Sequence, residues 1–177
     1  MVTSAKKKAW GFCGGYIVLI YGSLYIMRPL SNYLRTLLRG FYDLGVSFVL
    51  LALGVTIFCW SLRTIRRQRA FFKALFVISI LSYVFALYYL KIPEERVHLI
   101  EYGALALLVL KALQFDFKRE MYLYSLSFII VSGVGAADEF IQYLLPNRVG
   151  DVKDIMLNSF SGLLGLTFIF SLRDVCR

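Results

Sequence analysis

Charged residues are scarce in this chain of 177 residues. They make up 18% of it, whereas soluble globular proteins contain about 25%, and hydrophobic residues make up 59%. A chain with so few charges lacks the polar surface that a soluble domain needs. A membrane-spanning helix takes about 20 apolar residues, so the length allows roughly six spans and little else. We therefore expect one integral membrane domain over residues 1–177.

Cysteine is also rare, and its placement excludes several kinds of site. Cys13, Cys59 and Cys176 lie in or beside apolar runs, without a CxxC pair or a zinc-ligand spacing, so we expect neither a disulfide framework nor a structural zinc site. The sequence contains no GxSxG motif, no HExxH motif and no glycine-rich nucleotide fingerprint. The common hydrolase, metalloprotease and nucleotide-binding classes therefore have no signature here.

Long apolar runs are what the sequence does contain. Their lengths fit membrane helices, and no sustained alternation of the kind typical of strands is present. We predict an all-α polytopic helix bundle with about six transmembrane helices. The fourth and fifth runs lead directly into polar residues that we expect to continue the helix. The predicted spans lie near 10–27, 44–62, 71–90, 97–113, 121–137 and 154–172.

The formal net charge of +9 is explained by loops rather than by a nucleic-acid partner, which we do not expect. If the N-terminus is cytoplasmic, thirteen of the twenty Lys and Arg residues fall on the cytoplasmic side, as the positive-inside rule requires. The loop RTIRRQRAFFK, residues 63–73, contributes most to this asymmetry. We therefore predict that both termini are cytoplasmic.

The segment at 28–43 has its own pattern. Leu30, Leu34, Leu37 and Phe41 recur at helical spacing, with arginines elsewhere on the surface. This pattern predicts an amphipathic helix lying on the membrane interface, where basic residues attract anionic lipid. The alternative is an ordinary solvated connector with a helical turn.

Polar residues gather in the second half of the chain, first in KIPEERVHLIEYG. His98 and Glu101 are three residues apart, and His98 and Tyr102 are four apart, so the three side chains share one helix face. Glu101 enters an apolar run about one turn below the expected interface. A charge at that depth costs several kcal/mol unless it is paired or hydrated, so we expect it to have partners.

A second polar stretch follows the fifth apolar run. Asp138, Glu139 and Gln142 are related by helical spacings, and the small residues of SGVGAA directly before them would let a neighbouring helix approach closely. Arg148 lies in the following turn and is the natural partner for the carboxylates, because its guanidinium is weakly hydrated and bidentate.

The start of the last run extends this polar stretch. Asp151, Asp154 and Asn158 fall at helical spacing, and Gly162 and Gly165 continue the same stripe. A helix face that is acidic at its start and has glycines further along predicts close helix packing around a polar pocket. For Asp151 the competing interpretation is a helix N-cap. Topology alone predicts that both polar stretches meet at the outer face of the membrane.

The two stretches together resemble the VanZ-like family of small bacterial membrane proteins over about residues 90–170. The resemblance implies a multi-pass protein of the bacterial cytoplasmic membrane associated with the cell envelope, and the family's named member is linked to teicoplanin resistance. It does not imply a defined reaction. The residues that carry it are His98, Tyr102, Glu139, Gln142, Pro146, Arg148, Asp151, Asp154, Asn158, Gly162 and Gly165.

Our leading hypothesis is an acidic outer-face site that binds or acts on a lipid-linked envelope intermediate or a glycopeptide. Candidate acid–base residues are Glu139, Asp151, Asp154 and His98. Candidate ligand-binding residues are Arg148, Gln142, Asn158, Glu101, Tyr102 and Asp138. The alternatives are a proton- or ion-coupled transporter, a non-catalytic envelope scaffold, and binding of a hard divalent cation such as Mg²⁺ or Ca²⁺ by the carboxylates; no other cofactor is expected.

Overall fold

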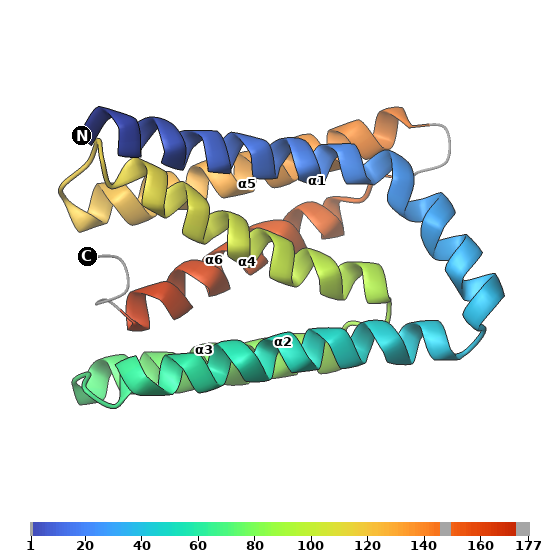
Figure 1. Ribbon diagram of the computed structural model, residues 1–177, viewed down its shortest axis with the longest axis horizontal. Helices are drawn as coiled ribbons and strands as arrows, with labels where there is room; N and C mark the ends of the chain where they lie inside the picture. The colour runs from blue at the N-terminus through green and yellow to red at the C-terminus, as the bar shows by residue number, and fades with distance from the viewer. Residues whose placement is uncertain (1, 146–149, 173–177) are drawn as a thin grey trace. The chain divides into compact units, whose positions relative to one another are not determined.

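A computed structural model describes residues 2–145 and 150–172 of the chain, and within them the polypeptide forms six helices and no strand (Figure 1). The all-α class predicted from the sequence is confirmed. Five of the helices, all except α4, are long and apolar enough to cross a membrane. The helices are α1 (Val2–Leu38), α2 (Phe41–Ile65), α3 (Ala70–Tyr89), α4 (Pro93–Leu113), α5 (Glu120–Leu144) and α6 (Val152–Ser171).

Most of the helices are longer than the apolar runs that predicted them. The largest extension is in α1, which continues past the first run to Leu38 with Pro29 inside it. Helix α5 runs on to Leu144, which confirms that the polar residues after the fifth run stay helical. Which termini face the cytoplasm is still a prediction.

The segment at 28–43 differs from its prediction in one respect. It is not a separate helix, because residues 28–38 form the end of α1. The chain breaks at Arg39, whose φ of 50° is left-handed, and α2 begins at Phe41. Left-handed backbone is unfavourable for residues with a Cβ atom and cannot continue a right-handed helix. Whether this segment lies on a membrane interface stays a prediction.

The described chain divides into two compact units. The first draws on Met1–Tyr25 and His98–Leu166, and the second on Ile26–Val97 and Thr167–Arg177. The expectation of one integral membrane domain therefore stays a prediction, and each unit is described by itself.

Helix α4 is the most enclosed element of the first unit. Leu99, Leu105, Ala106 and Val109 have no exposed surface. Charged residues occur along α4, and Glu101 lies within its apolar part. Protein rather than lipid surrounds most of the helix, which explains how an ionisable residue is accommodated in it.

The second unit has a small hydrophobic core and an ion pair between an arginine and a glutamate. Ile65, Phe76 and Leu172 are buried together. Arg35 pairs with Glu94 at 2.9 Å, so this glutamate forms an ion pair as well as lying in the first turn of α4.

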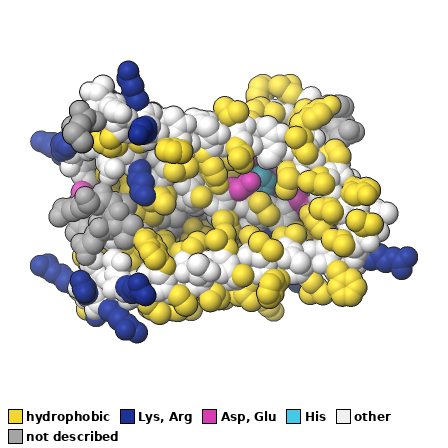
Figure 2. Space-filling view, viewed as in Figure 1, with side chains coloured by type: hydrophobic (Ala, Val, Ile, Leu, Met, Phe, Trp, Pro, Cys, Tyr) yellow, Lys and Arg dark blue, Asp and Glu magenta, His cyan; other side chains and the backbone are white. Residues whose placement is uncertain are grey.

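Outward-facing hydrophobic side chains cover much of the surface seen in Figure 2, as expected for helices in contact with lipid.

Candidate functional site

His98, Glu101 and Tyr102 share one face of α4, and two of them contact α5. His98 Nδ1 lies 3.5 Å from a carboxylate oxygen of Glu101, one turn along the helix. The rings of His98 and Tyr102 are 6.1 Å apart. The shared face predicted from the spacing is therefore present, and Figure 2 shows acidic side chains beside the histidine within a mostly hydrophobic surface.

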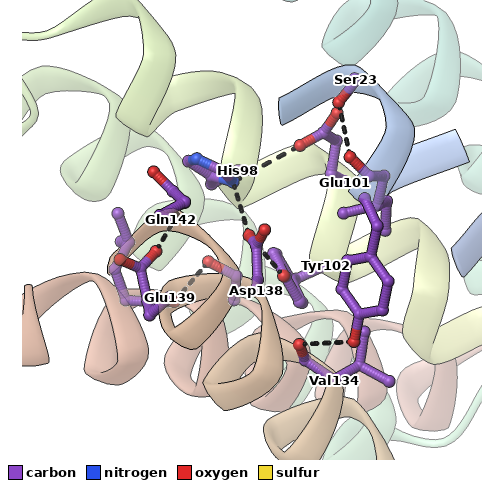
Figure 3. A network of polar contacts seen from close by, with 12 residues as sticks. Ser23, His98, Glu101, Tyr102, Val134, Asp138, Glu139 and Gln142 are labelled. Atoms are coloured by element: carbon purple, nitrogen blue, oxygen red, sulfur yellow. Dashed lines mark hydrogen bonds and ion pairs between the residues drawn. The ribbon is translucent and has the colours of Figure 1, made fainter. Parts of the chain in front are cut away.

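Asp138 of α5 is where the α4 residues converge. Its side chain has no exposed surface. The Tyr102 hydroxyl donates a 2.8 Å hydrogen bond to Asp138 Oδ2, and His98 Nδ1 lies 4.0 Å from the same oxygen. Figure 3 shows His98, Glu101 and Asp138 directed toward one another. We call His98, Glu101, Tyr102 and Asp138 the His98 cluster.

Helix α1 supports this cluster with two tyrosines that the sequence patterns did not single out. Tyr21 donates a 3.1 Å hydrogen bond to the backbone carbonyl of Val134, one turn before Asp138. Tyr16 donates one of 3.3 Å to the carbonyl of Glu101. Both tyrosines lie among apolar residues of the first run, where aromatic side chains most simply indicate packing or an interfacial belt. Only the packing of α1 against α4 and α5 reveals their contacts.

Glu139 points away from the His98 cluster although it follows Asp138 directly. Its Oε2 accepts a 3.2 Å hydrogen bond from the backbone N–H of Asp151, just before α6, and its Oε1 accepts one of 3.0 Å from Gln142. Adjacent helix positions point about 100° apart, so the two carboxylates serve different neighbours. Glu139 thus has partners both in α5 and at the start of α6, and we call Glu139, Gln142 and the Asp151 amide the Glu139 cap.

Asp151 and Asp154 behave as residues of a helix start. Asp151 is exposed, and its Oδ1 accepts a 2.9 Å hydrogen bond from the N–H of Lys153. Since α6 begins at Val152, this contact is that of an N-cap, the alternative considered for Asp151. Asp154 is half-buried, and in the part of the chain that the structure describes its side chain makes neither a hydrogen bond nor an ion pair.

Asn158 lies deeper, where α6 meets α5. Its side chain is fully buried, and within residues 2–145 and 150–172 neither atom of its amide has a hydrogen-bond partner. A Cβ atom placed on Gly135 would lie 2.7 Å from Asn158 Cβ and 3.3 Å from the Tyr102 ring. Asn158 and Tyr102 thus meet over the bare backbone of Gly135, one turn before Asp138.

The glycine stripe of α6 continues this close packing below Asn158. A Cβ atom on Gly162 would lie 2.6 Å from Val131 of α5, and one on Gly165 would lie 2.7 Å from the Cα atom of Gly103 in α4. The stripe therefore packs within the chain. Its small residues let α6 approach α4 and α5 closely enough to support the His98 cluster.

Two further predictions for the site concern Arg148 and a divalent cation. Arg148 lies outside the described residues. A divalent cation finds no group of three His, Cys, Asp or Glu side chains able to hold it within residues 2–145 and 150–172. The carboxylates of Glu101, Asp138 and Glu139 contact a histidine, a tyrosine, an amide side chain and a backbone amide.

The chemistry available to the His98 cluster is that of proton exchange and polar binding. An imidazole ring can accept or donate a proton toward a neighbouring carboxylate. Tyr102 orients Asp138 through its hydroxyl. The cluster thus combines an imidazole with a buried carboxylate that has a fixed hydrogen-bond partner, an arrangement suited to general acid–base chemistry or to recognition of a polar ligand.

Comparison with known proteins identifies one sequence family that the chain matches. The sequence model of the VanZ/LLP1 family matches residues 16–173. The match covers nearly the whole chain, including helices that carry none of the motif residues. Neither the curated proteins nor the solved structures contain a match to the chain.

Proposed function

The chain belongs to the VanZ-like family, and on that premise we propose that it is a multi-pass protein of the bacterial cytoplasmic membrane that handles a polar envelope molecule through the His98 cluster. The molecule would be a lipid-linked cell-wall intermediate or a teicoplanin-type glycopeptide. Under this proposal the protein contributes to glycopeptide resistance or to the handling of envelope precursors at the outer face.

The burial of Asp138 is the observation that supports the proposal most directly. Keeping an ionisable side chain inside a membrane helix bundle costs several kcal/mol. Hydrophobic packing alone would hold α4 and α5 together without that cost. A buried carboxylate that contacts both a tyrosine and the chain's single histidine is therefore best explained by a use for its charge or its proton.

We assign roles by position. His98 exchanges protons with Glu101 and Asp138, and Tyr102 orients Asp138. Arg148 binds phosphate or carboxylate of the ligand. Gln142 and Asn158 supply amide contacts. Glu139, Asp151 and Asp154 were acid–base candidates, and the first two now carry contacts that also have a structural explanation.

A scaffold function is the second candidate, and the Glu139 cap favours it. Glu139, Gln142 and the Asp151 amide satisfy one another at the junction of α5 and α6, which requires no ligand. A proton- or ion-coupled transporter is the third candidate and would use the His98 cluster as a relay.

The decisive experiment measures teicoplanin susceptibility of a sensitive bacterial host that expresses the chain. We expect the wild-type chain to raise the inhibitory concentration and Asp138→Asn to abolish this effect, because the amide keeps the size of the side chain but removes its charge. Asp116→Asn, on the exposed loop before α5, is the matched control and should retain full activity.

Membrane content and thermal stability of each variant separate the candidates. An Asp138→Asn protein that inserts at normal levels, melts normally and lacks activity supports a functional site. Parallel loss of stability and activity favours the scaffold. Normal resistance with a well-folded Asp138→Asn protein removes the proposal, and proton flux in proteoliposomes would favour the transporter instead.

A further inference from the structure

We propose that the turn between α2 and α3 is a binding surface for the headgroups of anionic phospholipids. The surface consists of five basic residues, and it is independent of the function proposed for the His98 cluster. All of its members belong to the second unit. They are Arg63, Arg66, Arg67, Arg69 and Lys73, which we call the basic turn.

The first step is that the basic turn is exposed and lacks internal neutralisation. Each of its five side chains is exposed. In the described part of the chain none of them forms an ion pair. No Asp or Glu occurs between Leu44 and Pro93, so α2, α3 and the turn between them contain no carboxylate after Asp43. A counter-charge for this surface must come from outside these two helices and their turn.

The second step is that stabilisation of α2 and α3 by their helix dipoles does not explain why all five residues are basic. Arg63 and Arg66 lie at the C-terminal end of α2, where a helix dipole favours cations. Arg69 and Lys73 lie at the N-terminal end of α3, where the dipole disfavours them, and the first turn of α3 has no acidic residue. Two of the five basic residues are thus placed against the local electrostatics of the helix that they begin.

The third step is the position of the turn relative to a bilayer. Both α2 and α3 are apolar enough to span a membrane, so the four residues between them emerge at a membrane surface. Trp60 near the end of α2 is 55% exposed and Phe71 at the start of α3 is 63% exposed. Aromatic side chains at this level mark the boundary between hydrocarbon and headgroups. The basic residues therefore lie at headgroup depth.

The occupant follows from these three steps. A surface at headgroup depth that is cationic and without carboxylates is complementary to lipid phosphates with a net negative charge. One arginine guanidinium group can donate two parallel hydrogen bonds to two oxygens of a phosphate. Neutral zwitterionic headgroups carry their own ammonium charge and gain less from the same cations, so the surface should select anionic phospholipid from a mixture.

The chain offers a direct reporter for this selection. It contains two tryptophans, and Trp60 is only six residues from Arg66, or about 9 Å along a helix. In a Trp10→Phe background Trp60 is the sole tryptophan, and its emission can be excited selectively over that of tyrosine. The full chain is reconstituted into neutral phosphatidylcholine vesicles that contain brominated phosphatidylglycerol or brominated phosphatidylcholine at equal mole fraction, and quenching of Trp60 measures which lipid is enriched.

We expect brominated phosphatidylglycerol to quench Trp60 more strongly, with an enrichment of severalfold that falls as salt is raised. The double variant Arg66→Gln, Arg67→Gln should lower this enrichment to near equality with the neutral lipid, because each basic residue near the surface contributes about a fivefold factor. Arg39→Gln, Lys91→Gln is the matched control, since these exposed cations lie at the opposite ends of α2 and α3. This control should keep the enrichment.

Equal quenching by both lipids in the Trp10→Phe protein would overturn the inference. It would also be overturned if the Arg66→Gln, Arg67→Gln variant kept the full enrichment, or if the control pair lost it to the same extent. Circular dichroism and size-exclusion elution confirm that each variant is folded. None of these outcomes depends on teicoplanin resistance, so this proposal and the proposed function fail separately.

Discussion

The Tyr102 hydroxyl donates a 2.8 Å hydrogen bond to Asp138 Oδ2 although 36 residues separate the two in the chain. Both side chains are fully buried. This bond joins α4 to α5 at the centre of the His98 cluster, and its partner is an ionisable group. Its loss should therefore affect both the stability of the first unit and the properties of Asp138.

Replacing Tyr102 by phenylalanine tests the strength of that bond. Tyr102→Phe should lower the free energy of unfolding by about 1.5–3 kcal/mol, the range for a hydrogen bond to a charged group. A cycle with Asp138→Asn, measured by unfolding in detergent, should give a coupling energy above about 0.5 kcal/mol. Tyr122→Phe, an exposed tyrosine of α5, should change stability little. Additivity of the Tyr102 and Asp138 variants would contradict the contact.

The glycine pair between α4 and α6 predicts a sharp difference between two alanine substitutions. A Cβ atom on Gly165 would lie 2.7 Å from Gly103 Cα and 2.9 Å from its carbonyl oxygen, and backbone atoms cannot move aside as a side chain can. Gly165→Ala should cost about 1–3 kcal/mol. Gly133→Ala, where nothing lies within 4 Å, should be neutral or stabilising. Thermal melts in detergent compare the two, and equal effects would argue against helix contact at Gly165.

Asn158 predicts a separation of stability from function. Its buried amide has no partner in the described residues, and such a group costs about 1–3 kcal/mol. Asn158→Leu should therefore leave the melting temperature unchanged or raise it, while activity falls if the amide contacts a ligand. Gln142→Leu is the contrasting variant, because the Gln142 amide donates to Glu139 and its loss should destabilise. A large loss of stability in Asn158→Leu would show that the amide is satisfied in the native protein.

The Glu139 cap predicts a local change in hydrogen exchange. Glu139→Ala removes the acceptor of the Asp151 amide, so the start of α6 should open more often. Mass spectrometry of peptides covering 150–155 should report faster exchange, with little change in α4. Asp116→Ala, on the exposed loop before α5, should leave these peptides unaffected. Unchanged exchange in Glu139→Ala would mean that Glu139 does not hold the start of α6.

The ion pair between Lys6 and Asp116 predicts a pH effect outside the membrane-spanning helices. A hydrogen bond from Lys6 lowers the pKa of Asp116 from its ordinary value of 3.8. A lowered folded-state pKa means that the contribution to stability is present above pH 3.8 and is lost as the pH falls through the folded value. Nuclear magnetic resonance titration should give a depressed pKa in the wild-type chain and an ordinary one in Lys6→Gln. Identical pKa values in the two proteins would refute the pairing.

Much of the fold could be predicted from the sequence because membrane helices are encoded locally. Long apolar runs predicted every helix, and the polar residues after the fifth run were correctly expected to continue α5. The shared face of His98, Glu101 and Tyr102 also follows from spacing along one helix. The family resemblance over about 90–170 was confirmed and extends over residues 16–173.

Contacts between helices were less predictable, since they depend on rotation and depth rather than on periodicity. Spacing places Asp138 and Glu139 in one polar stretch, yet a turn of about 100° per residue directs them to α4 and α6 respectively. Tyr16 and Tyr21 carry no sequence signal, because an aromatic residue in an apolar run looks the same whether it faces lipid or a carbonyl group. Asp151 had two interpretations, and its contact with Lys153 supports the helix cap.

The sequence by itself determined that this protein is a helical membrane protein, which residues are charged within it, and which apolar run forms each helix, because hydropathy and helical periodicity act over neighbouring residues. Only the tertiary structure decided which of those charges meet. The bare backbones of Gly135, Gly162 and Gly165 allow α6 to approach α4 and α5, and that approach brings Asn158 against Tyr102 while Tyr102 holds Asp138. Close packing of this kind depends on the shapes of three helices at once, and no single stretch of the chain contains that information.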